Sequence, residues 1–126
     1  MDRVLGRLGM QGAGAPTLMV VGGLHGNEPA GVEAARRVNA ALTDRSAKLE
    51  GAVVFVAGNL QALVRGRRYI DRDLNRAWTS SRVEALLASA ERGDGEALPE
   101  AEDVEQRELL SLIEVTLAEA QGPVFV

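Results

Sequence analysis

Residues 17–31 read TLMVVGGLHGNEPAG, and this stretch decides which fold we expect. It begins with a short apolar run, residues 17–21, which suits a buried strand. Small residues from Gly22 to Gly26 let the backbone turn sharply, and Pro29 suits the first turn of a helix, where its missing N–H costs nothing. The stretch therefore predicts a strand that passes through a glycine loop into a helix.

The only histidine of the chain, His25, lies in this glycine loop, three residues before Glu28. Both side chains should lie at the carboxyl end of the strand, where open α/β sheets usually hold ligands. One imidazole and one carboxylate at this spacing can bind the same divalent metal, and zinc suits that pair best. Taken alone, the pattern is short, and a hydrogen-bonded turn histidine beside an acidic residue that complements the helix dipole explains it more simply.

A second motif, RRYIDRDLNR at residues 67–76, reverses that balance. Together with GGLHGNEPAG it resembles the succinylglutamate desuccinylase and aspartoacylase family, within the wider clan of zinc carboxypeptidases. The order and the spacing of the two motifs both match. The resemblance covers essentially the whole chain but only the opening part of the family's catalytic domain. It implies an α/β fold, a mixed β-sheet flanked by helices, as the N-terminal part of a zinc carboxypeptidase-like (phosphorylase/hydrolase-like) fold.

The resemblance implies roles for five residues. His25 and Glu28 correspond to zinc ligands, so one Zn²⁺ is the implied cofactor. Arg68 corresponds to the catalytic arginine that contacts the substrate and polarises its scissile carbonyl, and Asn75 with Arg76 corresponds to a pair that holds a substrate carboxylate. A guanidinium suits that task because it can bind a carboxylate through two parallel hydrogen bonds. The implied reaction is zinc-dependent hydrolysis of an amide, which removes an acyl group from an N-acyl amino acid such as N-succinylglutamate or N-acetylaspartate.

The chain supplies only part of that machinery. A His-Glu-His set is one of the known catalytic zinc sites, and this sequence has one histidine. In the family, the second zinc histidine and the catalytic glutamate come later in the chain. We therefore expect residues 1–126 to be a single, truncated domain that is inactive alone. Two alternatives stay open, a carboxypeptidase-like metallopeptidase and a non-catalytic metal- or anion-binding module or inactive fragment.

Composition points to a small cytoplasmic protein. A chain of 126 residues with 46% hydrophobic and 25% charged residues is ordinary for one globular domain. The net charge of −4 argues against nucleic-acid binding, and the basic cluster within residues 65–76 suits a small anionic substrate better. Without cysteine, no thiolate metal site can form, and neither a signal peptide nor a bilayer-spanning segment is recognisable. The oligomeric state is left open.

Hydrophobic patterns predict the remaining elements. We expect strands over residues 3–10, 52–57 and 124–126, and helices over residues 28–42, 81–90 and 100–120. A right-handed βαβ crossover should join residues 17–22 to residues 52–57, and residues 17–22 should also form an antiparallel hairpin with residues 3–10. Residues 60–77 read as a long loop with at most one helical turn, and residues 92–95 as a turn.

Several side-chain placements follow from the same patterns. Ser80 or Ser81 should cap the helix over residues 81–90. Asp71 and Asp73 either orient Arg68 and Arg76 or merely balance nearby arginines, and these two hypotheses stay equal. The other arginines of this region, Arg65, Arg67 and Arg72, should be solvated. The helix expected over residues 28–42 should bury Gly31, Ala34, Ala35, Val38, Ala41 and Leu42. The helix expected over residues 100–120 should bury Val104, Leu109, Leu112, Ile113, Thr116, Leu117 and Ala120.

Overall fold

The computed structural model describes residues 1–46, 48–91 and 100–126. Its elements, in chain order, are β1 Val4–Gly9, β2 Thr17–Gly22, α1 Ala30–Asp44, β3 Ala52–Ala57, α2 Leu60–Arg65, the 3-10 turn η1 Leu74–Arg76, α3 Ser80–Glu91, α4 Ala101–Glu119 and β4 Val124–Phe125. The predicted strands and the three long helices therefore form within two residues of their expected bounds. The turn expected over residues 92–95 lies outside the described residues.

The four strands form one mixed sheet in the order β1-β3-β2-β4. β2 runs parallel to β3, with Thr17 opposite Ala52 and Gly22 opposite Ala57, and α1 connects the two strands. The predicted hairpin between β1 and β2 is wrong, because β1 pairs antiparallel with β3. As the most apolar strand, β3 takes a central place, where both its edges are hydrogen-bonded and both its faces are covered.

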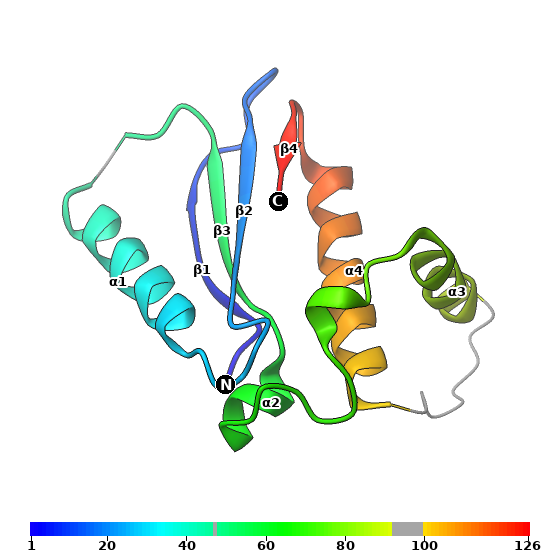
Figure 1. Cartoon of the computed structure of the whole chain (residues 1–126). Coiled ribbons are helices and arrows are strands. Elements are labelled where there is room, and N and C mark those ends of the chain that lie inside the picture. The colour runs from blue at the N-terminus through cyan, green and yellow to red at the C-terminus, as the bar shows by residue number, and fades with distance from the viewer. Residues whose placement is uncertain (47, 92–99) are drawn as a thin grey trace.

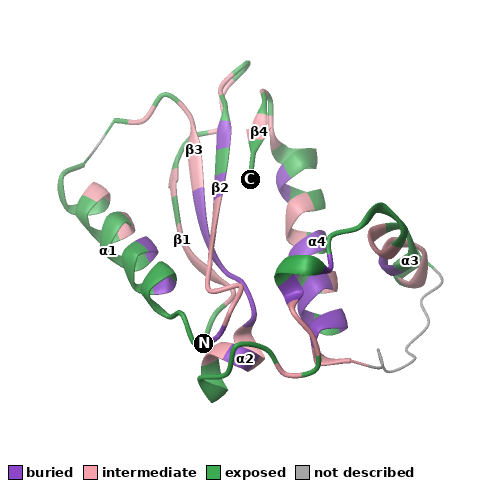
Figure 2. Ribbon diagram, viewed as in Figure 1, coloured by how far each residue is buried: buried purple, intermediate pink, exposed green. Residues whose placement is uncertain are grey.

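Helices cover both faces of this sheet, with α1 on one side and α4 on the other (Figure 1). Successive side chains of a strand point to opposite faces, so Val54 and Val56 pack toward α4 while Phe55 points toward α1. The main core lies under α4 and joins the sheet, α4 and the segment before α3 (Figure 2). Its buried members are Met19, Val54, Val56, Leu74, Ala77 and Leu109.

The buried face of α1 is narrower than predicted. Val32 and Ala35 are buried, whereas Val38 is 47% exposed. Asn39 is half-buried against the sheet because Gly6 has no side chain there. A Cβ on Gly6 would lie 2.3 Å from Oδ1 of Asn39. Gly6 on β1 therefore leaves room for the side chain of Asn39 between α1 and the sheet.

α4 buries an unexpected set of residues. Leu109 and Thr116 are buried as predicted, but Val104 and Leu117 are exposed. In the first two turns of the helix the buried side chains are polar or charged, namely Glu102, Asp103, Glu105 and Gln106. These side chains contact the long segment between β3 and α3, whose backbone N–H groups need acceptors.

The segment between β3 and α3 contains more helix than expected, because both α2 and η1 lie within residues 60–77. The cap of α3 also differs from the prediction. The hydroxyl of Thr79, rather than that of Ser80 or Ser81, accepts a hydrogen bond from the N–H of Arg82 at 3.4 Å. Thr79 therefore stands at the position where an N-cap side chain reaches the first helical turn.

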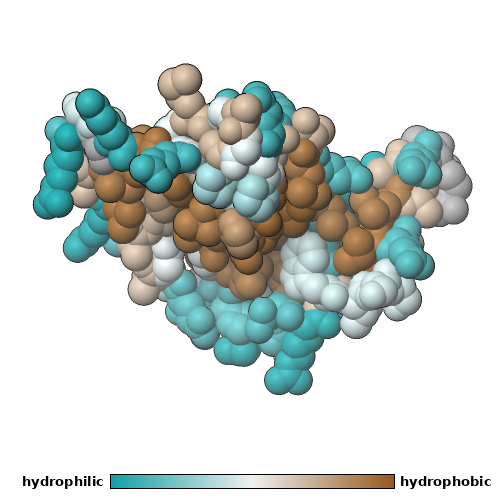
Figure 3. All heavy atoms as spheres, turned by 90° about the horizontal axis from the view of Figure 1, so that it is seen from above, coloured by the Kyte–Doolittle hydropathy of each residue, from teal (hydrophilic) through white to brown (hydrophobic). Residues whose placement is uncertain are grey.

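Seen from above, apolar residues gather along the middle of the molecule, with hydrophilic residues on the side of α1 (Figure 3). Large apolar side chains with substantial exposure include Leu18, Phe125 and Val126. Within the described residues, none of the helices combines the length and the apolar character needed to cross a bilayer.

Candidate metal and substrate site

Two loops meet at the carboxyl ends of the parallel strands β2 and β3. We call residues 23–29 the histidine loop and residues 66–73 the motif loop. The N–H of Asn59, just after β3, donates to the carbonyl of Gly23 at 2.9 Å, and the N–H of Gly26 donates to the carbonyl of Arg68 at 3.2 Å. Both motifs singled out from the sequence therefore lie side by side, at the edge where α/β sheets hold ligands.

Gly26 allows the close approach of the histidine loop to α2. A Cβ at this position would lie 2.0 Å from the carbonyl carbon of Ala62 in α2. Real side chains do not come that close to a backbone, so only glycine fits without moving either the histidine loop or α2. The packing of the histidine loop against α2 thus explains why residue 26 is a glycine.

His25 is held in one orientation by Asp73. Its Nε2 lies 3.0 Å from Oδ1 of Asp73, and its side chain is 12% exposed. An ionised carboxylate only accepts hydrogen bonds, so Nε2 is the donor to Asp73 and Nδ1 points away from it. Nδ1 faces Oε1 of Glu28 at 3.4 Å. An imidazole nitrogen and a carboxylate oxygen, two atom types that can bind a metal ion, therefore face each other.

Asp73 organises more than the histidine. Its Oδ1 also accepts the N–H of Asn75 at 3.0 Å, and its Oδ2 lies 3.6 Å from Nη2 of Arg68. The hydrogen bond from His25 is the main cause that lowers the pKa of Asp73, and the N–H of Asn75 and the charge of Arg68 add to it against a smaller opposing effect of burial. Asp73 therefore stays ionised at neutral pH.

The structure brings most of the predicted site residues together. Nη1 of Arg68 lies 3.6 Å from Oε1 of Glu28, and Asn75 lines a cleft of about 740 Å³ with His25 and Glu28. Arg76 is different, because its side chain is 85% exposed and only its Nε comes within 3.9 Å of Asp73.

The two aspartates of the motif loop have separate roles. Asp73 contacts both Arg68 and Arg76, as one of the two hypotheses expected, but neither hypothesis described the partner of Asp71. Asp71 accepts the N–H of Ala101 at 2.7 Å, which satisfies a free donor at the start of α4. Asp73 orients His25, a contact that sequence reasoning missed. The sequence signal available was local: an Asp before the turn Leu74–Arg76 predicts a cap, and the bond to His25 requires the tertiary fold.

The prediction that Arg72 is solvated is wrong, although Arg65 and Arg67 are exposed as expected. The guanidinium of Arg72 pairs with Asp103 and lies 2.9 Å from Glu100. Asp103 also pairs with Arg82 of α3. Arg72 therefore fastens the motif loop to α4 instead of contributing to a substrate-binding surface.

The donor set fits part of a zinc site. An imidazole nitrogen and a carboxylate oxygen are ligands that zinc prefers, and the carboxylate behind the imidazole is the usual support of a metal-binding histidine. Among the residues that the structure describes, no group of three or more His, Cys, Asp or Glu side chains is arranged to hold a metal ion. His25 and Glu28 therefore form an incomplete set.

Glu102 of α4 binds the backbone of the motif loop through hydrogen bonds. This carboxylate has no exposed surface and accepts hydrogen bonds from Nδ2 of Asn59 at 2.9 Å and from three consecutive backbone N–H groups, those of Ile70, Asp71 and Arg72, at 2.7, 2.9 and 3.2 Å. Burial alone disfavours the ionised form, but the four hydrogen bonds outweigh it and lower the pKa of Glu102.

This lowered pKa predicts a loss of stability in acid. An unperturbed glutamate has a pKa of about 4.3, so folding favours the ionised form and its stabilisation is complete above that pH. The free energy of unfolding should fall as the pH drops through the folded-state pKa. Urea denaturation between pH 7 and pH 3 measures this. The Glu102→Gln variant should show a smaller slope with pH, and the exposed Glu114→Gln variant the wild-type slope; equal slopes in all three proteins would contradict the assignment.

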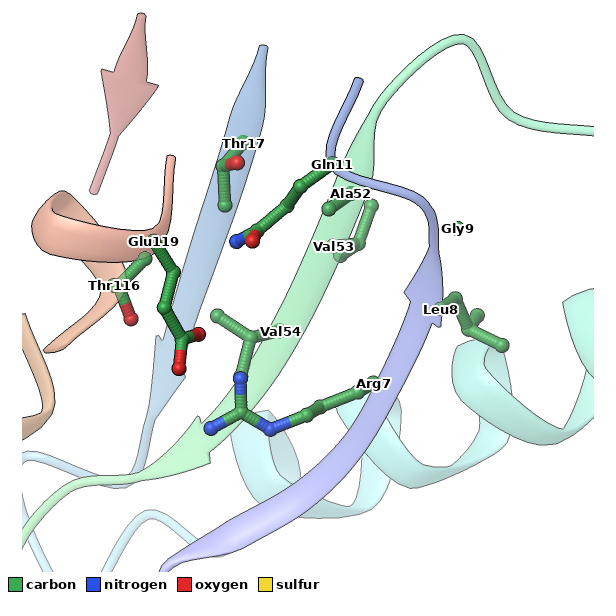
Figure 4. A pocket seen from close by; sticks show the side chains of 10 residues that line it. All are labelled: Arg7, Leu8, Gly9, Gln11, Thr17, Ala52, Val53, Val54, Thr116 and Glu119. Carbon is green, nitrogen blue, oxygen red and sulfur yellow. The ribbon is translucent and has the colours of Figure 1, made fainter. Parts of the chain in front are cut away.

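A second cavity, of about 220 Å³, lies at the opposite end of the strands, where β2 and β3 begin (Figure 4). Arg7 and Glu119 extend into this region from β1 and α4. The other lining residues are Leu8, Gly9, Gln11, Thr17, Ala52, Val53, Val54 and Thr116. None of the predicted site residues is among them, so the two motifs select the cleft at the carboxyl ends of the strands.

Comparison with known proteins identifies the family of this chain. A family model described as the succinylglutamate desuccinylase/aspartoacylase catalytic domain matches residues 14–117. The chain belongs to this family. The resemblance inferred from the two motifs is thereby confirmed, and both motifs lie inside the matched residues.

Individual relatives in the family are matched over part of their length. A succinylglutamate desuccinylase of Pseudomonas paraeruginosa is 34% identical over 67 residues, which are 53% of this chain and 20% of the relative. One from Photorhabdus laumondii is 38% identical over 63 residues, 50% of this chain and 19% of the relative. The chain thus spans about a fifth of the length of these curated relatives.

Solved structures of the family share the fold. The succinylglutamate desuccinylase of Chromobacterium violaceum superposes with a TM-score of 0.59 at 30% identity, over 89% of this chain and 31% of that one. The succinylglutamate desuccinylase of Vibrio cholerae gives a TM-score of 0.63 at 21% identity, over 86% of this chain and 28% of that one, which is a likeness in fold alone. The predicted fold class, a mixed sheet flanked by helices, is confirmed.

Proposed function

We propose that this chain contributes two zinc ligands, His25 and Glu28, to a zinc-dependent deacylase that hydrolyses the amide bond of an N-acyl amino acid. The observation that carries the proposal is the orientation of His25. Asp73 accepts a hydrogen bond from Nε2, which leaves Nδ1 facing the Glu28 carboxylate. A second histidine, which this sequence does not contain, would complete the His-Glu-His set that the family resemblance implies.

The other site residues fit the substrate of such a reaction. Bound zinc supplies a water of lowered pKa and a Lewis acid for the carbonyl. Arg68 lies beside Glu28, where its guanidinium can donate hydrogen bonds to the carbonyl oxygen as negative charge develops. Arg76 is free to turn toward a carboxylate because most of its side chain is exposed, and Asn75 lines the cleft as a further donor.

The residues at and near the cleft support one substrate class. Two arginines and one asparagine beside a metal site suit a molecule that presents both an amide carbonyl and a carboxylate, as every N-acyl amino acid does. N-succinylglutamate is the specific candidate, because the relatives described above are named for its hydrolysis. N-acetylaspartate has the same two groups and is the alternative substrate within the family.

Zinc titration tests the metal ligands directly. We expect the 126-residue chain to bind one zinc ion, measured by calorimetry, and His25→Ala and Glu28→Gln each to weaken binding at least about tenfold, since each removes one ligand. Glu84→Gln, an exposed substitution on α3, is the charge-matched control and should bind as the wild type does. No saturable binding up to millimolar zinc, or binding that His25→Ala leaves unchanged, would contradict the proposal.

A further inference from the structure

Glu102 is hydrogen-bonded to the motif loop and to Asn59, the residue that contacts the histidine loop. Its three backbone donors, Ile70, Asp71 and Arg72, lie between Arg68 and Asp73 in the chain. These two residues contact Glu28 and His25 respectively. One buried carboxylate of α4 therefore fixes the part of the motif loop that connects the substrate arginine to the residue that orients the histidine.

The fourth donor extends this junction to the histidine loop. Asn59, which is fully buried, donates to Glu102 through Nδ2 and accepts the N–H of Ala62 through Oδ1. Its own N–H donates to the carbonyl of Gly23, the first residue of the histidine loop. Glu102 is thus linked by short hydrogen bonds to both loops of the site, although it lies in a helix that neither motif includes.

We propose that Glu102 is a positioning residue of the candidate site, which sets the place of Arg68 and Asp73 through the backbone of the motif loop. This inference rests on the proposed function for its meaning in catalysis, but its geometric content stands alone. Both oxygens of Glu102 are used, since Oε1 accepts from Asn59 and Ile70 while Oε2 accepts from Asp71 and Arg72. Glutamine has nearly the same shape but only one acceptor oxygen, so its amide NH₂ must face N–H donors.

A purely structural role is the competing explanation, and Glu105 offers a matched control for it. Glu105 is 3% exposed, lies one turn further along α4 and also binds backbone N–H groups, those of Leu60 and Gln61 in α2. Its loss should destabilise the protein through α2 without freeing the motif loop. A difference between the Glu102 and Glu105 variants therefore reports on position rather than on burial of a carboxylate.

The NMR resonance of the single histidine distinguishes the two explanations. A Glu102 variant that only loses stability should leave this resonance unchanged. In the wild type, the Nε2–H of His25 is hydrogen-bonded to Asp73 and largely shielded from water, so its proton should give a separate NMR resonance. We expect Glu102→Gln to broaden or abolish this resonance and to speed amide exchange of Ile70, Asp71 and Arg72 at least about tenfold beyond any change in global exchange. Zinc affinity should fall at least about fivefold.

Control variants decide the interpretation. Glu105→Gln and the exposed Glu114→Gln should keep the His25 resonance and the zinc affinity, even where Glu105→Gln lowers stability. If Glu102→Gln does not fold, Glu102→Asp keeps the charge but shortens the reach, and the same loss of the His25 resonance is expected. A Glu102 variant that is destabilised but keeps this resonance and the amide protection overturns the proposal. If the wild-type chain binds no zinc, the proposed function fails, while the resonance and the exchange rates still decide the role of Glu102.

Discussion

Replacing Asn59 with aspartate is expected to lower the free energy of unfolding by about 3–5 kcal/mol at pH 7, the range seen when a buried charge loses its partner. The substitution removes the Nδ2 donor that Glu102 accepts at 2.9 Å and places a second carboxylate against it. Both residues have no exposed surface, so solvent cannot screen the repulsion. The acceptor that caps α2 at Ala62 is kept, which leaves the loss of the donor and the added charge as the two changes.

The pH dependence of this variant distinguishes charge repulsion from simple misfit. Like charges raise the pKa of a carboxyl group in the folded state, so the penalty is largest above that pKa and shrinks when the pair holds a shared proton. Urea denaturation should therefore show a smaller deficit from the wild type at pH 4.5 than at pH 7. Gln121→Glu makes the same amide-to-carboxylate change at an exposed position and should change stability little. A deficit that is equal at both pH values would mean that packing, not charge, is responsible.

Gly26→Ala is expected to have the second large effect, and to act on the site as well as on stability. The added methyl group would lie 2.0 Å from the backbone of Ala62, so the histidine loop must move away from α2. That movement breaks the hydrogen bond from Gly26 to the carbonyl of Arg68 and separates the two loops. We expect a loss of about 2–4 kcal/mol, somewhat above ordinary overpacking because backbone rather than a side chain obstructs the methyl group.

Thermal or urea denaturation measures the stability of Gly26→Ala, and zinc calorimetry measures its effect on the site. Gly12→Ala is the matched control, because the nearest atom to its new Cβ, apart from chain neighbours, is 3.9 Å away. It should be close to neutral in both assays. Wild-type stability and zinc affinity in Gly26→Ala would show that the contact between the histidine loop and α2 is looser than described here.

The sequence by itself determined the strands, the three long helices and the two motifs that meet at one edge of the sheet. Unbroken apolar runs and apolar periods of 3.6 residues are local signals, which is why the strand Ala52–Ala57 formed within its predicted bounds. The glycine loop, Pro29 and the second motif also identified the family, and they placed His25, Glu28, Arg68 and Asn75 in one region. Local chemistry was sufficient for the strands and the long helices because each depends on residues close together in the chain, whereas the family resemblance implied that the two motifs share one site.

Only the tertiary structure decided which partners those elements and side chains take. β1 pairs with β3 because an apolar strand gains most where both its edges are bonded, and this choice leaves no mark within β1 itself. Asp73 binds His25 across 48 residues, and Glu102 binds Ile70 across 32. The buried carboxylates of α4 look like a solvated helix face in the sequence. Their acceptors are needed because a distant loop presents unpaired N–H groups, and that need exists only once the chain has folded.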